Sequence, residues 1–303
     1  MTSNANENIS ADSKTNETML LISQQLQLLF SQNQIIINQN SATNFYLGQL
    51  AMYMSANEIR ESYRSASNKV LKGFKVYSQS DEDGILHGVF ERIGIDKGYF
   101  IEIGVENGIE CNSRLLLQLG WNGLWIEGSS ESCSSGGALW VEYIKNGQLT
   151  ILNEFVTAEN INLFIDDTQK SLDLLSIDVD GNDFYIWKSC NVRPKVVIIE
   201  YNAKFPPPIS VVQPYDSKWA WDHRTDDFGA SFSALVKLGE EKGYFPVACS
   251  ASGCNIVFVS DEFDSLFPRV SPQELYFPAR YDLISAPSFS RGHQAGKMIF
   301  ERY

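Results

Sequence analysis

The chain has 303 residues and a formal net charge of −13 at neutral pH, with 44% hydrophobic and 12% aromatic residues. This composition indicates a folded core, in one large domain with an appendage or in two small domains. Nucleic-acid backbones are bound through Lys and Arg, so the acidic balance argues against DNA or RNA as a partner.

The first part of the chain, residues 1–70, predicts a tail followed by helix. Residues 1–18 are rich in Asn, Ser and Thr, which is typical of disorder, and they lack the basic and apolar regions of a signal peptide. After them, apolar residues recur at helical spacing without an intervening proline, at Ile22, Leu26, Leu29 and Ile36. The pattern predicts one or two amphipathic helices, which either pack on the main domain or join chains into a homo-oligomer.

The second part, residues 71–303, predicts an α/β domain. A polar start and an apolar face predict a helix within residues 77–94. Five short runs rich in β-branched and aromatic residues follow, at 98–104, 123–128, 149–155, 172–180 and 195–202. Such runs, with helical segments between them, are typical of strands buried on both faces of a parallel sheet.

The last part of the domain departs from this alternation. A helix over 229–243 precedes two runs, 244–250 and 255–260, which are too close in sequence to pair other than as an antiparallel hairpin. The expected fold is therefore Rossmann-like, with a central, mostly parallel seven-stranded sheet that ends in an antiparallel hairpin. This is the order of the class I methyltransferase fold.

The first predicted strand runs into a turn that favours a cationic ligand. Gly104 and Gly108 allow close backbone approach, and Glu102 supplies negative charge where a dinucleotide would place its pyrophosphate. The turn, which includes Asn107, suits S-adenosylmethionine, whose amino and sulfonium groups are positive. The alternative is an ordinary Gly-rich connection.

The ends of the next two strands carry further polar side chains. Glu127 ends the second strand, where an acid can accept hydrogen bonds from both ribose hydroxyls of an adenosyl group. Asn153 and Glu154 end the third strand, where we expect the adenine. Each could be a plain surface residue, but their order along the sheet favours a cofactor site.

These segments in order, "SQSDEDGIL", "FIEIGVENGIECNSRLLLQLGWNGLWIEGS", "FVTAENIN", "LLSIDVDGNDFYIWKS", "VVIIEYNAKFPP" and "GASFSALVKLGEEKGY", resemble bacterial FkbM-type S-adenosylmethionine-dependent methyltransferases. The resemblance covers about residues 72–262. It implies methyl transfer to a sugar or polyketide hydroxyl, hence a small-molecule or glycan acceptor such as a polysaccharide precursor. In place of the family's Asp-x-Glu-Gly the chain has Asp178-Val-Asp180-Gly181, with a shorter acid.

This acidic turn has three interpretations. A calcium loop fails, because an EF-hand needs Gly at the sixth position and Glu at the twelfth, where this chain has Asp183 and Ser189. A metal-binding Asp-x-Asp of a glycosyltransferase leaves the first turn and the terminal hairpin unexplained. The third interpretation places Asp178 beside the cofactor's amino group, with Asp180 and Asp183 facing the acceptor.

The same turn offers candidates for a metal and for a base. Asp180, Asp183 and Glu200 are oxygen ligands of the kind that Mg²⁺ or Mn²⁺ prefers. Asp180, Asp183 and His223 are the candidate bases for the acceptor proton. Alternatively, Asn182 or Asp183 caps the following helix.

The long segment 201–231 is aromatic and rich in proline, which predicts an acceptor-binding insertion or lid. Tyr215, Trp219 and Trp221 either stack on a sugar ring or serve packing. Two alternative functions stay open, a metal-dependent glycosyltransferase and a catalytically inactive methyltransferase-fold binding subunit.

Cysteines and apolar runs bear on the location of the protein. Five cysteines form no Cys-x-x-Cys pair, and the three histidines stand far apart, so no zinc site is visible. An odd number of cysteines favours a reducing compartment. No apolar run is long enough to span a bilayer, and we expect a soluble, cytoplasmic protein without an integral membrane segment.

Overall fold

The computed structural model describes residues 22–43, 46–47, 50, 54, 73–165, 171–281 and 292–303. The chain divides into two compact units, residues 1–50 and 51–303. The predicted disordered tail and the predicted domain boundary at residue 70 lie outside the described residues and stay predictions.

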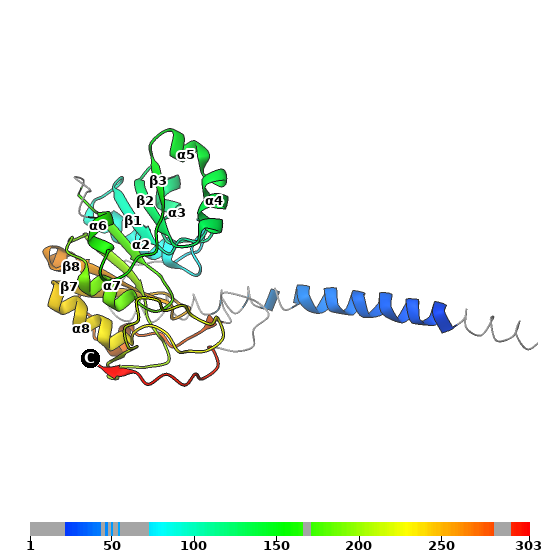
Figure 1. Cartoon of the computed structure of the whole chain (residues 1–303). Coiled ribbons are helices and arrows are strands. Elements are labelled where there is room, and N and C mark those ends of the chain that lie inside the picture. Colours follow the sequence, from blue (N-terminus) through cyan, green and yellow to red (C-terminus); the bar gives the residue numbers. More distant parts are fainter. Residues whose placement is uncertain are drawn as a thin grey trace, which may run out of the picture. The chain divides into compact units, whose positions relative to one another are not determined.

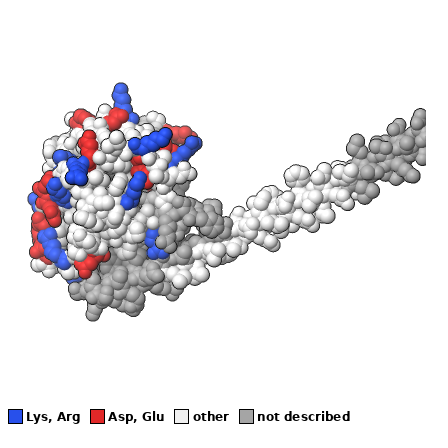
Figure 2. All heavy atoms as spheres, turned by 90° about the horizontal axis from the view of Figure 1, so that it is seen from below, with Lys and Arg blue, Asp and Glu red and all other residues white. Residues whose placement is uncertain are grey.

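The predicted N-terminal helix is present over residues 22–43 and is the blue helix of Figure 1. Every side chain in this range is exposed. The range contains no Asp, Glu, Lys or Arg, and Figure 2 shows its surface without charged side chains. Within the described part of the chain, no helix has both the length and the apolar character that a membrane crossing requires.

The second unit is built on a seven-stranded sheet with the strand order β3-β2-β1-β4-β5-β8-β7 (Figure 1). Its strands are β1 (Tyr99–Ile103), β2 (Asn122–Glu127), β3 (Leu149–Asn153), β4 (Leu174–Ile177), β5 (Val196–Glu200), β7 (Tyr244–Cys249) and β8 (Asn255–Ser260). β1 to β5 are parallel, β8 is antiparallel to β5, and β7 and β8 form the terminal hairpin. The predicted class I methyltransferase arrangement is confirmed.

The sheet is buried on both faces, because successive side chains of a strand point to opposite sides. Phe100 contributes to the core that α2 (Glu82–Ile93) and α3 (Arg114–Gln118) share with one face. Ile101 and Ile103 contribute to the core on the other face. That second core also contains residues of α6 (Ile161–Ile165), α7 (Asp183–Ser189) and α8 (Phe232–Lys242). Burial on both faces explains the near-continuous apolar runs of the sequence.

The remaining helices are short. They are α4 (Ser130–Leu139), α5 (Val141–Lys145), the 3₁₀ helix η1 (Asp261–Leu266) and α9 (Pro272–Leu275). The long helix α8 has clear ends, since the Ser231 hydroxyl accepts a hydrogen bond from the Ala234 amide and Gly243 is left-handed.

A second, two-stranded sheet was not predicted. β6 (Val211–Val212) lies in the long segment after β5 and pairs antiparallel with β9 (Glu301–Arg302). The carboxylate of Asp227 accepts hydrogen bonds from the amides of Lys297 and Met298, 2.6 and 3.0 Å away. The C-terminal residues therefore fasten the segment that follows β5.

The strand order also positions a binding site. β1 lies between β2 and β4, so the chain crosses to one side of β1 first and to the other side later. In open α/β sheets, ligands bind beyond the carboxyl ends of the strands at such a switch point.

Candidate active site

A cavity of about 610 Å³ opens at this switch point. It is lined by the turns that follow β1, β2, β3 and β4, and by residues 79, 219, 223 and 255 from elsewhere in the chain. Its volume is typical of pockets that bind small molecules. Seven predicted site residues line it: Glu102, Gly104, Glu127, Glu154, Asp178, Asp180 and His223. Five predicted residues do not: Asn107, Gly108, Asn153, Asp183 and Glu200.

The turn after β1 is held by a buried carboxylate. Glu102 accepts hydrogen bonds from the backbone amides of Asn112 and Ser113, both at 2.8 Å, and from the Ser113 hydroxyl. Burial raises the pKa of the Glu102 carboxyl, and these donors lower it by a smaller amount. The side chain therefore fixes the start of α3 while one edge faces the cavity.

Gly104 is required by close packing between two turns. Its φ is 81°, and a Cβ there would lie 1.7 Å from the carbonyl oxygen of Asp178. Gly108 has a different role, since its Cα faces the rings of Trp125 and Trp140 instead of the cavity. Asn107 lies in the same connection, where its backbone oxygen accepts a hydrogen bond from the Trp140 indole at 2.8 Å.

Glu127 ends β2 and joins two turns at the cavity. One carboxylate oxygen accepts a hydrogen bond from the Glu106 amide at 2.8 Å, and the other accepts from the Ser129 amide at 2.7 Å. Each oxygen has a second lone pair, so both can still accept from a ligand hydroxyl. The side chain is thus held in one orientation while its acceptor capacity stays open.

At the end of β3, the residue that faces the cavity differs from expectation. Asn153 donates to the Glu127 carbonyl at 2.9 Å and accepts from Ser130, so it braces the neighbouring strand. Phe155 lines the cavity with 55% of its surface exposed, beside Glu154. Sequence reasoning missed Phe155, although an aromatic residue after a strand was a signal for a stacking surface.

Asp183 holds the turn between β4 and α7. Its carboxylate accepts hydrogen bonds from the amides of Val179 and Gly181, at 2.9 and 2.8 Å, and the side chain is 1% exposed. Burial raises the pKa of this carboxyl to about 6. Asn182 makes no capping hydrogen bond and instead donates to the backbone oxygen of Asp216 at 2.7 Å.

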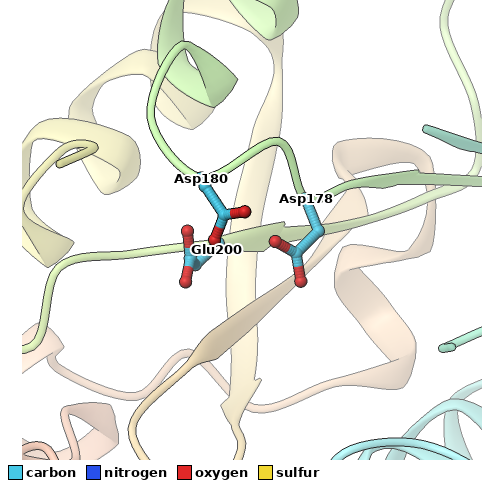
Figure 3. Close-up of side chains that lie close together, drawn as sticks. All are labelled: Asp178, Asp180 and Glu200. Carbon is cyan, nitrogen blue, oxygen red and sulfur yellow. The ribbon is translucent and has the colours of Figure 1, made fainter. Parts of the chain in front are cut away.

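Three carboxylates meet behind the turn. Asp178, Asp180 and Glu200 each have a possible ligand oxygen, and these oxygens lie within 4.8 Å of one another (Figure 3). The predicted metal set contained Asp183 where this cluster contains Asp178. In the described part of the chain, the buried Oε2 of Glu200 has no hydrogen-bond partner.

The cluster is electrostatically unfavourable without a cation. Burial, and then the neighbouring acids, raise the pKa of the Asp178 and Glu200 carboxyls well above their ordinary values. Burial also raises the pKa of Asp180, while His223 lowers it. A divalent cation or a cationic ligand group would offset this repulsion.

Backbone strain is concentrated at the cavity. In the described ranges, three residues other than glycine have a left-handed φ: Glu106 at 51°, Asp180 at 54° and His223 at 56°. All three line the cavity. Such conformations are uncommon outside glycine and cluster at functional sites.

The segment after β5 supplies the outer wall. Trp219 lines the cavity, and its indole donates to the backbone oxygen of Asp180 at 3.0 Å. His223 also lines it. Trp221 instead packs against His223, Phe228 and His293 with ring centroids 4.7–5.2 Å apart. Tyr215 bonds to Glu159 outside the cavity.

Two lining residues come from distant segments that the sequence did not indicate. Gln79 belongs to the stretch before α2, and Asn255 begins β8. Asn255 is 1% exposed, and its amide nitrogen donates to Glu82 at 3.2 Å. Its Oδ1 has no hydrogen-bond partner among the described residues.

Four of the five cysteines are buried, and Cys133 is intermediate in exposure. Cys111 lines the cavity, and burial raises the pKa of its thiol well above the usual value. Cys133 is half-buried in α4, and its thiol lies 3.4 Å from the backbone oxygen of Glu127. Burial raises the pKa of the Cys133 thiol as well.

No protein family model matches the chain, and no curated protein sequence matches it. Solved structures similar to it include S-adenosylmethionine-dependent methyltransferases. One is a putative caffeoyl-CoA O-methyltransferase from Staphylococcus aureus, with 13% identity over 72% of this chain and 99% of that chain, at a TM-score of 0.40.

Two other similar structures were solved with a ligand present. The O-methyltransferase TomG from Streptomyces achromogenes, in complex with S-adenosylmethionine, has 14% identity, covers 68% of this chain and 89% of its own, and gives a TM-score of 0.36. The N-terminal domain of EvdMO1, in the presence of S-adenosylhomocysteine and D-fucose, has 16% identity and covers 66% and 95%, with a TM-score of 0.40. TM-scores this low carry no argument, so the fold assignment rests on the strand order alone.

Proposed function

We propose that the protein is an S-adenosylmethionine-dependent methyltransferase that methylates a hydroxyl group of a sugar, in a glycan or polysaccharide precursor. The observation that carries the proposal is the cavity at the switch point of a class I methyltransferase sheet, with acids at the ends of β1, β2, β3 and β4. A ligand that is cationic at its reactive centre suits such a lining.

The cofactor would extend along the strand ends. Glu127 would accept hydrogen bonds from the ribose hydroxyls, and the exposed ring of Phe155 would stack on the adenine, with Glu154 beside it. The backbone at Gly104 would approach the ligand closely, and Asp178 would face the cofactor's amino group. When bound, S-adenosylmethionine supplies the methyl group.

The acceptor would enter from the side of Trp219 and His223. Trp219 would offer a face for a sugar ring, and Asp180 or His223 would take the hydroxyl proton as the oxygen forms its bond to the methyl carbon and the methyl–sulfur bond breaks. Asp183 would act through the turn that it holds, as a positioning residue.

Mg²⁺ or Mn²⁺ fits the cluster of Asp178, Asp180 and Glu200, because these are three oxygen donors and one buried oxygen has no partner among the described residues. A bound ion would lower the pKa of the acceptor hydroxyl. A glycosyltransferase is disfavoured, since neither Lys nor Arg lines the described cavity to bind a diphosphate.

The first test is cofactor affinity. The Glu127→Ala variant loses ribose hydrogen bonds of about 1.5–3 kcal/mol each, so calorimetry should show at least about tenfold weaker binding of S-adenosylmethionine. Glu142→Ala, which removes an exposed carboxylate outside the cavity, is the control and should bind as the wild type does. A wild-type protein that binds no S-adenosylmethionine would refute the proposal.

The second test is turnover, read as S-adenosylhomocysteine release with sugar acceptors. Asp180→Asn should keep cofactor affinity within a few-fold while turnover falls by about 10²–10⁴, the usual effect of losing an acid–base group. EDTA should mimic the variant, and Mg²⁺ or Mn²⁺ should restore activity. Unchanged turnover would remove Asp180 from the chemistry, and cofactor binding without any transfer would favour an inactive binding subunit.

A further inference from the structure

The lining of the cavity has charge of one sign. Seven acidic residues line it, Glu102, Glu106, Glu110, Glu127, Glu154, Asp178 and Asp180, and Glu200 lies next to the last two. His223 is the single basic side chain in the described lining. The cavity walls therefore carry negative potential, which low-dielectric surroundings strengthen.

Few of these charges are neutralised within the described residues. Lys75 pairs with Glu110 at 3.1 Å, at the rim of the cavity. Glu127 accepts two backbone hydrogen bonds, which stabilise a carboxylate without removing its charge. Among the ion pairs of the described chain, none includes Asp178 or Asp180.

A bound divalent cation and the cofactor would not make this part of the site positively charged. Three carboxylates with one divalent cation leave a net charge of −1, as the sum of −3 and +2 shows for the cluster of three acids. The cofactor's single sulfonium charge then brings that part of the site close to neutral. The site therefore lacks the surplus of positive charge that a phosphate or carboxylate acceptor needs.

Asn255 is independent support from the far wall. Its side chain is buried and lines the cavity, and its Oδ1 has no partner in the described part of the molecule. The amide orientation is fixed by the hydrogen bond from Nδ2 to Glu82. The unpartnered group of Asn255 is thus an acceptor, and the side chain adds no positive group to the lining.

We propose that this pocket excludes anions, and that the acceptor is a neutral or amine-bearing hydroxyl compound, not a sugar phosphate or a nucleoside-diphosphate sugar. The inference on the acceptor rests on the proposed methyltransferase function. Exclusion of anions from the cavity is a property of the chain itself and can be measured without a substrate.

Tryptophan fluorescence provides that measurement. Of the six tryptophans, Trp121, Trp125, Trp140 and Trp187 are at most 6% exposed, so Trp219 and Trp221 dominate quenching by ions. Only Trp219 of this pair lines the cavity, and the difference between the wild type and Trp219→Phe isolates its signal. The quenching constants of caesium and iodide are measured at constant ionic strength. Each is divided by the constant that the same ion gives with free N-acetyl-tryptophanamide.

Caesium should quench Trp219 at least about threefold more effectively than iodide, because a potential of about one kT or more enriches cations at the site. Asp180→Asn should lower this ratio, while Trp221→Phe should leave the Trp219 signal unchanged. Iodide quenching equal to or stronger than that of caesium would overturn the proposal.

A second measurement compares acceptors on protein saturated with S-adenosylmethionine. Neutral hexose glycosides and hexosamines are paired with their phosphates and nucleoside-diphosphate conjugates. We expect kcat/KM at least tenfold lower for the anion of each pair, which is about 1.4 kcal/mol. Preference for an anion would overturn the proposal, and if no sugar is turned over the quenching result decides it alone. Failure of the methyltransferase assignment appears separately, as absent cofactor binding.

Discussion

Individual residues at the cavity have strained backbones. Asp180 has a φ of 54°, and its backbone oxygen accepts the Trp219 indole hydrogen bond at 3.0 Å. Asp183 holds the amides on either side of it. The strained residue is therefore fixed from two directions, which directs its carboxylate toward Asp178 and Glu200 (Figure 3).

Asp81 shows how a partly buried acid affects stability. Burial, and then Glu82, raise the pKa of its carboxyl from 3.8 to about 7. The folded protein keeps this proton while the unfolded chain has already released it, so the free energy of unfolding falls as the pH rises from about 4 to about 7. Asp81→Asn keeps an oxygen for the Ala251 amide, 2.7 Å away, and removes the titration.

We expect Asp81→Asn to be more stable than the wild type at pH 8, on the order of 2 kcal/mol, and nearly equal to it below pH 4. Urea unfolding at several pH values measures this difference. Asp96→Asn, at an exposed position, is the control and should follow the wild type. Parallel pH profiles for Asp81→Asn and the wild type would contradict the prediction.

Positions at the cavity were predictable where a side chain stands at the end of its own strand. Glu127, Asp178 and Asp180 follow their strands directly, and the strand order alone brings them to one cavity. Asn255 begins a distant strand, so nothing local in the sequence marks it. Asp183 illustrates the opposite case, because an acid in a turn has the same sequence signal whether it faces a ligand or the backbone.

Among the elements, the C-terminal segment determines how firmly the outer wall of the cavity is held. The backbone of Gln294 pairs with Arg224 and Asp226, 3.2 and 2.9 Å away, next to His223. Asp227 binds the amides of residues 297 and 298. The wall that carries Trp219 and His223 is thus tied to residues at the end of the sequence.

Asp227→Ala should therefore increase local opening both in the C-terminal segment and in the segment that follows β5. It removes two charged hydrogen bonds of about 1.5–3 kcal/mol each, so amide exchange should accelerate at least about tenfold in residues 294–303 and 211–225. Asp264→Ala, which removes an exposed ion pair with Arg269, is the matched control. Unchanged exchange in residues 211–225 would show that the wall is held without the C-terminal segment.

Secondary-structure elements with a long apolar pattern in the sequence were predicted, and elements of only two residues were not. The seven strands of the main sheet are apolar runs of four to six residues, and their order followed from the helices and the closing hairpin. β6 and β9 have two residues each and lie far apart in the chain. Strands so short leave no periodicity to detect, and their pairing depends on tertiary contacts.

At the scale of the whole molecule, the N-terminal helix differs from the rest in leaving its apolar side chains exposed, with Leu26 at 51% and Leu29 at 54%. In proteins most helical stability comes from packing of an amphipathic face, and this helix has no charged pairs of its own to support it. Burial of the apolar residues against other copies of the chain would stabilise it.

Deleting residues 1–65 should leave the α/β domain folded and able to bind the proposed cofactor, because the described sheet and cavity lie entirely after residue 72. Light scattering should show a lower oligomeric state for this protein than for the full chain. A full-length Leu29→Ser/Ile36→Ser variant should show the same loss. The same number of chains per particle in all three proteins would contradict a role of the helix in oligomerisation.

The distribution of the cysteines has a practical consequence. Four thiols are buried, and the fifth, Cys133, lies beside the backbone of Glu127 at the end of β2. A maleimide dye would therefore attach to the natural protein at one position, at mildly alkaline pH because the thiol pKa is raised. Its emission would report occupancy of the cavity in real time, so that ligand libraries could be screened before the acceptor is identified.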